Sequence, residues 1–194
     1  MPAPPVLLDA NVLVPLSTRD LFLDADIANL VRVRWTDAIL AEVQRNVMRF
    51  TSAATATSLI AEMNRIFPDA RVTAYEGFTA QMTNDPKDRH VAAAAASIGA
   101  DILTFNLRHF PAATLAPFGV RAFHPDEFLA GLADTAIGTF AEILRDSAAR
   151  RRNPPVPLSA LVARLATPLP QFAAQMRAHY RATDEPGFIG KEVP

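Results

Sequence analysis

Cysteine is absent from the 194 residues of this chain. That absence excludes disulfide bonds, thiolate metal sites and a cysteine nucleophile. It also fits a reducing compartment, because disulfides persist mainly in oxidising ones. We therefore expect a cytoplasmic protein whose chemistry depends on other residue types.

Long apolar runs are also missing, since none approaches the roughly 20 residues needed to cross a bilayer. The first residues carry no basic group, and Asp9, Asn11 and Pro15 interrupt the apolar stretch that follows, which is atypical of a signal peptide. The net charge is only −1, so no overall positive field attracts nucleic acid. We expect a soluble protein without membrane contact, in which any nucleic acid binds a local basic patch.

Several common active-site signatures do not occur in the sequence. We find no Gly-rich phosphate loop, dinucleotide fingerprint or nucleophile elbow. The four histidines are His90, His109, His124 and His179, and they lack metal-ligand spacing, so a zinc site is not expected.

Half of the residues are hydrophobic, which is enough for a well-buried core. Short apolar or alternating runs predict strands, and segments with helical periodicity separate them. Strands that alternate with helices through short connections predict an α/β fold with a parallel sheet. The predicted strands cover residues 6–8, 31–35, 72–75, 102–105 and 119–123, and the predicted helices 18–30, 36–47, 54–67 and 85–98.

The pattern changes beyond Pro125, where the remaining predicted elements are helices. They cover residues 126–152, 158–165 and 171–180, with a proline-rich break at 153–157. We predict a first domain of residues 1–128, followed by a helical C-terminal extension of residues 129–194 that ends in a flexible tail.

The segment 84–90 carries two aspartates three residues apart, Asp85 and Asp88. We predict that Asp85 is the N-cap of a helix whose first residue is Pro86, which places Asp88 one turn later on the same face. Three alanines continue that face: Ala92, Ala95 and Ala96. Because small residues allow the helix to approach the sheet closely, we expect Asp88 to lie near the ends of the strands.

Two polar residues follow predicted strands directly, Asp9 and Asn106. Each could simply form a turn, but a carboxylate at the end of a buried strand is unfavourable unless it is paired or binds a cation. Glu42 lies beside the apolar stripe of its helix, where a solvated glutamate is the ordinary alternative.

If Asp9, Glu42 and Asp88 converge, they form an all-oxygen anionic site that suits Mg²⁺ or Mn²⁺. Such an ion activates water for phosphodiester hydrolysis. Nearby positive residues could then hold the nucleic-acid backbone. We expect RNA contacts from three of them: Arg45, Arg89 and Arg108.

Four short segments together resemble the PIN-domain ribonucleases, in particular the VapC-type toxins of toxin–antitoxin pairs. They are residues 6–13, 41–43, 85–91 and 99–106, and the resemblance covers about residues 5–128. It implies a PIN-like three-layer α/β/α fold with metal-binding acids at the positions of Asp9, Glu42 and Asp88. Asp85 and Asn106 are further candidate ligands, although Asn106 stands where the family often has an aspartate.

The resemblance also implies an activity and partners. It points to an Mg²⁺- or Mn²⁺-dependent endoribonuclease that cleaves single-stranded RNA and leaves 5′-phosphate ends. A cognate antitoxin and a homodimer are implied as partners.

Two other functions remain open. A catalytically degenerate PIN-type binding module is consistent with Asn106. A haloacid-dehalogenase-type phosphatase also begins with an aspartate at a strand end, but it requires a second aspartate where this chain has Asn11.

Overall fold

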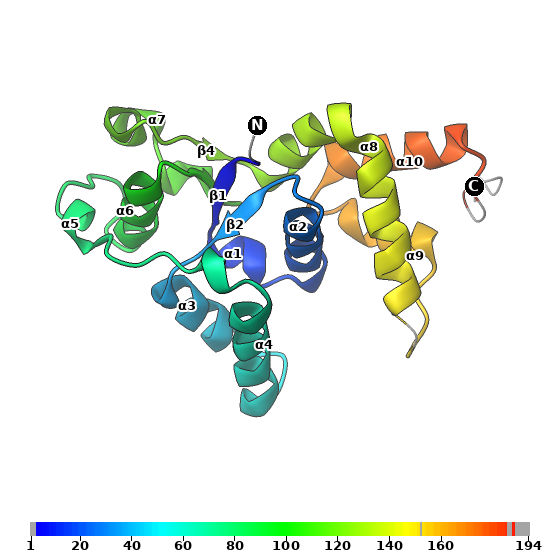
Figure 1. Cartoon of the computed structure of the whole chain (residues 1–194), viewed down its shortest axis with the longest axis horizontal. Helices are drawn as coiled ribbons and strands as arrows, with labels where there is room; N and C mark the ends of the chain where they lie inside the picture. Colours follow the sequence, from blue (N-terminus) through cyan, green and yellow to red (C-terminus); the bar gives the residue numbers. More distant parts are fainter. Residues whose placement is uncertain (1–2, 152, 186–187, 189–194) are drawn as a thin grey trace.

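The computed structural model describes residues 3–151, 153–185 and 188, and its centre is a parallel sheet (Figure 1). The strand order is β2-β1-β3-β4, and all three pairings are parallel. The two central strands are buried because they are short apolar runs covered on both faces. The strands are β1 Pro5–Leu8, β2 Arg32–Arg34, β3 Asp101–Leu103 and β4 Ala122–Phe123.

Helices cover both faces of this sheet, with α5 and α6 on one side and α2 on the other (Figure 1). The predicted three-layer α/β/α architecture is therefore confirmed. Within the described residues, no helix is both long enough and apolar enough to cross a membrane. The helices of this part are α1 Ala10–Leu13, α2 Leu16–Ile27, α3 Asp37–Val47, α4 Ala53–Ile66, α5 Glu76–Thr79, α6 Arg89–Ile98 and α7 Ala112–Leu115, with short 3₁₀ turns η1 Pro68–Ala70, η2 Leu107–His109 and η3 Ala116–Phe118.

The start of α6 differs from the prediction, which was wrong in making Asp85 the N-cap. The carboxylate of Asp85 accepts a hydrogen bond from the backbone N–H of Lys87 (3.0 Å), and its carbonyl accepts one from Asp88 (2.9 Å). These bonds close a turn, so the helix begins only at Arg89. Its end was predicted correctly, because Gly99 adopts the left-handed conformation at φ 62°.

The predicted strand at 72–75 is also wrong. The chain makes only an isolated bridge between Trp35 and Arg71, with Val72 donating to the carbonyl of Trp35 (2.8 Å). Ala74 then takes a left-handed conformation (φ 59°), which ends extended pairing.

The C-terminal part is helical, as predicted, and packs as a bundle of three helices. The rings of Phe140 and Phe172 meet edge to face at 5.1 Å, and the hydroxyl of Tyr180 donates to the carbonyl of Ala141 (2.9 Å). These helices are α8 Pro125–Arg150, which is kinked at Ala136, α9 Leu158–Leu165 and α10 Pro170–Ala182. Helix α8 runs without a break through residue 128, so the boundary proposed there remains a prediction. Arg152 and most of the predicted tail lie outside the described residues.

One buried acid joins two of these helices. Asp126, in the first turn of α8, accepts hydrogen bonds from the backbone N–H groups of Gln171 and Phe172, both at 3.0 Å. It therefore caps the N-terminus of α10 from a different helix.

We expect Asp126→Ala to lower the free energy of unfolding by about 1–3 kcal/mol, because the buried N–H of Phe172 loses its acceptor. Urea unfolding followed by circular dichroism measures the change. The control is Glu127→Ala, which removes the neighbouring exposed acid. Equal losses in the two variants would contradict the capping role.

Candidate functional site

Asp9 lies at the carboxyl end of β1 and is only 7% exposed. Its carboxylate accepts hydrogen bonds from the backbone N–H of Ala10, the amide of Asn11 and the hydroxyl of Thr104, each at 2.7 Å. The chain turns into α1 directly after it. Asp9 is therefore fixed at the edge of the sheet where parallel strands end, the usual place for a ligand site in such sheets.

Asn11 and Thr104 connect the ends of the two central strands. The amide of Asn11 donates to the hydroxyl of Thr104 (3.0 Å) and accepts from the backbone N–H of Phe105 (3.1 Å). The hydroxyl also accepts from the backbone N–H of Asn106 (3.0 Å). Sequence reasoning missed Thr104 as a site residue. The available signal was its position one residue after β3 and two residues before Asn106.

Burial raises the pKa of Asp9, and the negative charges of Asp88 and Glu42 raise it further. The hydrogen bonds from Thr104 and Ala10 act in the opposite direction, because they favour the carboxylate. Asp88 and Glu42, the other two acids predicted from the sequence, thus each repel Asp9 at this edge. All three offer oxygen atoms, the ligand type that suits Mg²⁺ or Mn²⁺, and a cation bound among them would relieve this repulsion.

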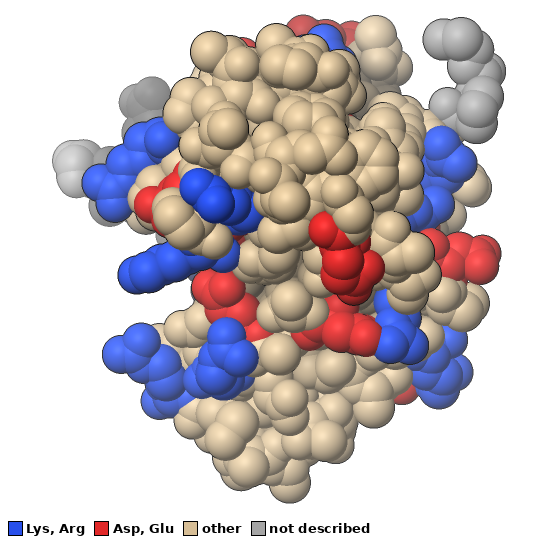
Figure 2. Space-filling view, turned by 90° about the vertical axis from the view of Figure 1, so that its left-hand side faces the viewer, with Lys and Arg blue, Asp and Glu red and all other residues tan. Residues whose placement is uncertain are grey.

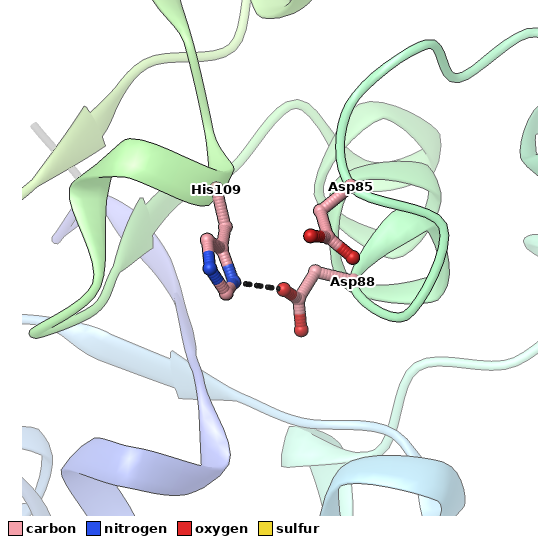
Figure 3. Close-up of side chains that lie close together, drawn as sticks. All are labelled: Asp85, Asp88 and His109. Atoms are coloured by element: carbon pink, nitrogen blue, oxygen red, sulfur yellow. Dashed lines mark hydrogen bonds and ion pairs between the residues drawn. The ribbon is translucent and has the colours of Figure 1, made fainter.

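A second group of side chains adjoins these acids: Asp85, Asp88 and His109 (Figure 3). Each offers a ligand atom within 4.8 Å of the others. Nδ1 of His109 lies 2.6 Å from a carboxylate oxygen of Asp88 and donates to it, because a carboxylate can only accept. The sequence suggested His109 only as one of several positive groups that could hold a nucleic-acid backbone, and it did not predict the contact with Asp88, which lies 21 residues earlier in the chain. The position of His109 three residues after Asn106 was the available signal.

The other two candidate ligands are Glu42 and Asn106, and neither forms a hydrogen bond with Asp9 or Asp88 among the described residues. Glu42 is half-buried on α3, and no hydrogen bond or ion pair to its carboxylate is found among the described residues. The amide nitrogen of Asn106 lies 2.9 and 3.1 Å from the two ring nitrogens of His109. Asn106 therefore contacts the histidine that contacts Asp88.

The predicted RNA-binding arginines lie in different surroundings. Arg45 is exposed on α3, and Arg108 is exposed and donates to Nε2 of His109 (3.2 Å). Arg89 is partly buried and donates to the backbone carbonyl of Asn84 (3.2 Å). On the face shown in Figure 2, acidic side chains occupy the middle, and several Lys and Arg side chains gather along the left-hand margin. Basic groups close to an acidic centre suit a phosphate backbone, and contact with RNA remains a prediction.

Comparisons with known proteins agree with this architecture. A family model described as the VapC50 C-terminal domain matches residues 125–178. A protein of Mycobacterium tuberculosis (strain ATCC 25618 / H37Rv) described as "Putative ribonuclease VapC50" is 36% identical over 104 residues, which is 53% of this chain and 62% of that relative. The match thus spans less than two thirds of the relative's length, and no solved structure matches the chain. The parallel α/β domain and the matched helical segment support the resemblance to VapC-type PIN-domain proteins that carry a C-terminal extension.

Proposed function

We propose that this chain is a metal-dependent endoribonuclease that cleaves single-stranded RNA. The observation that carries the proposal is the buried carboxylate of Asp9, held by three hydrogen bonds and repelled by Asp88 and Glu42. A rigid anionic centre of this kind is expected where a cation is bound. The similarity to a relative described as a ribonuclease supports the same activity.

Asp9, Glu42 and Asp88 would hold the cation, with Asp85 and Asn106 at the margin of the site. A bound Mg²⁺ or Mn²⁺ ion supplies a water of lowered pKa and polarises a phosphoryl oxygen. The protein keeps Asp9 in one orientation through Asn11 and Thr104.

Basic side chains would align the RNA backbone at this centre. Arg45 and Arg108 are exposed, and Arg108 uses only its Nε–H towards His109, which leaves its other N–H groups for a phosphate. Arg89 is partly buried and bonds to the backbone of Asn84. We therefore assign Arg45 and Arg108 to direct phosphate contact and Arg89 to the support of the 84–88 segment.

Purified protein incubated with labelled single-stranded RNA tests this activity. We expect cleavage in Mg²⁺ or Mn²⁺, complete loss of cleavage in EDTA and products with 5′-phosphate ends. A duplex of the same sequence should be cut more slowly. Equal cleavage in EDTA, or no cleavage of any RNA in a diverse panel with either metal, would overturn the proposal.

The proposed biological role is that of a cytoplasmic toxin whose partners are RNA, a cognate antitoxin and a second copy of the chain. This role rests on the family relationship. The non-catalytic binding module remains a second candidate, since Asn106 supplies an amide where the family often has an acid. It predicts metal binding without turnover in the assay described above.

The phosphatase alternative is not favoured by the surroundings of Asp9. That chemistry requires an acid two residues later, and the side chain there is the amide of Asn11, which bonds to Asp9.

A further inference from the structure

His109 makes the contact that holds the carboxylate of Asp88. Among the described residues, this carboxylate accepts no other hydrogen bond, and it does not cap α6, at whose start it lies. The carboxylates of Asp85 and Asp9 are both near that of Asp88. Their negative charges therefore disfavour the observed position of the Asp88 carboxylate. Without His109, the side chain of Asp88 is free to change rotamer.

The histidine is itself held firmly against the segment that contains Asp88. Its backbone N–H donates to the carbonyl of Asn106 (3.1 Å), and its carbonyl accepts from the amide of Asn84 (3.4 Å). Asn84 is buried and lies immediately before the turn at Asp85. Both the side chain and the backbone of His109 therefore connect η2 to the 84–88 segment, as Figure 3 shows for the side chain.

Both ring nitrogens of His109 are engaged. Nδ1 donates to Asp88, and Nε2 accepts from the Nε–H of Arg108 (3.2 Å). The amide nitrogen of Asn106 lies against the ring, 2.9 Å from Nδ1 and 3.1 Å from Nε2. A metal-ligating imidazole needs a free lone pair on one nitrogen. The contacts of His109 instead correspond to those of a residue that hydrogen-bonds a ligating carboxylate and so fixes its orientation without binding the metal.

We propose that His109 is a positioning residue for Asp88, which sets the affinity of the site for Mg²⁺ or Mn²⁺ without binding the ion itself. The inference rests on the proposed function, because it concerns the same Mg²⁺ or Mn²⁺ ion that Asp9, Glu42 and Asp88 are proposed to hold. It makes η2 part of the site.

Titration of Mn²⁺ into four variants, followed by calorimetry, tests this role. His109→Ala should weaken binding about 10–100-fold, the usual effect of removing the partner of a ligand. His109→Asn places an amide N–H near the position of Nδ1 and should stay within about threefold of the wild type. His109→Gln places its amide near Nε2 instead and should resemble the alanine variant. His90→Ala is the control, because His90 contacts the backbone of Lys87 and not Asp88, and it should bind Mn²⁺ normally.

Three results would overturn the proposal. The first is unchanged Mn²⁺ affinity in His109→Ala, or, should that variant not fold, equal affinity in the Asn and Gln variants. The second is a directly coordinated nitrogen in the pulsed electron paramagnetic resonance spectrum of bound Mn²⁺ that disappears in the His109 variants, which would make His109 a ligand. The third is a wild-type protein that binds no Mn²⁺.

The failure of the proposed function looks different. A wild-type protein that binds Mn²⁺ but cleaves no RNA removes the nuclease assignment, and the comparison of the His109 variants still decides whether the histidine positions Asp88.

Discussion

Replacing Asp9 with asparagine should reduce RNA cleavage by on the order of a thousandfold while making the metal-free protein more stable. The first effect follows because the variant loses the most rigidly held carboxylate of the site. The second follows because the variant also loses a buried charge that Asp88 and Glu42 repel.

The gain in stability should depend on pH. The pKa of Asp9 is raised in the folded protein by burial and by the two neighbouring acids, so the folded state holds its proton at a pH where the unfolded state has released it. The contribution of Asp9 to stability is therefore fully present below its ordinary pKa and is lost as the pH rises through the raised value. The advantage of Asp9→Asn should be absent in acid and appear towards neutral pH.

Urea unfolding in EDTA across a pH series, together with RNA cleavage at neutral pH, measures both effects. Mn²⁺ should stabilise the wild type and leave the variant unchanged. Asp101→Asn is the matched control for cleavage, because Asp101 lies at the opposite end of β3 and pairs with Arg121. Cleavage by Asp9→Asn within tenfold of the wild type would contradict the assignment of Asp9 to the metal site. A stability difference that does not change with pH would contradict the raised pKa of Asp9.

Phe172→Ala should lower the free energy of unfolding by about 3–5 kcal/mol. Phe172 is completely buried, and its ring packs edge to face on Phe140. The extension shares one continuous hydrophobic core with the α/β domain. Two ion pairs also connect the two parts, Arg150 with Asp24 (2.5 Å) and Arg151 with Asp20 (2.7 Å). We therefore expect the whole chain to unfold in one transition.

Trp35 makes this expectation measurable, since it is the only tryptophan and is buried in the α/β domain. Its fluorescence and the circular dichroism signal should shift to lower urea together in Phe172→Ala. Phe50→Ala is the control, because Phe50 is 83% exposed, and its midpoint should hardly move. Loss of helical signal at a lower urea concentration than the change in Trp35 fluorescence would show that the extension unfolds by itself.

The features that depend on local pattern were predictable from the sequence. The apolar run before Asp9 gave a buried strand that ends at an acid, and Thr36 caps α3 through the backbone N–H of Ile39, as expected for a threonine before a helix. Gly99 likewise ends α6 in the left-handed conformation.

The errors arise where two local structures compete or where partners are distant in sequence. Asp85 offers its carboxylate equally to a helix cap or to a turn, and the pattern does not distinguish them. The residues 72–75 lack a neighbouring strand with which to pair beyond the single bridge at Trp35. The bond from His109 to Asp88 joins two loops, and hydrophobic periodicity carries no information about such contacts.

The hydrogen bonds to Asp9 also limit the denticity of its carboxylate. Each carboxylate oxygen has two lone pairs, and Oδ2 already accepts from both Asn11 and Thr104, whereas Oδ1 accepts from Ala10 alone. One lone pair, on Oδ1, is left for a cation, so Asp9 can contribute a single oxygen to its coordination shell. Calcium commonly takes both oxygens of a carboxylate, whereas magnesium is satisfied by one and keeps its waters. The bonds that hold Asp9 in place thus also disfavour the larger ion.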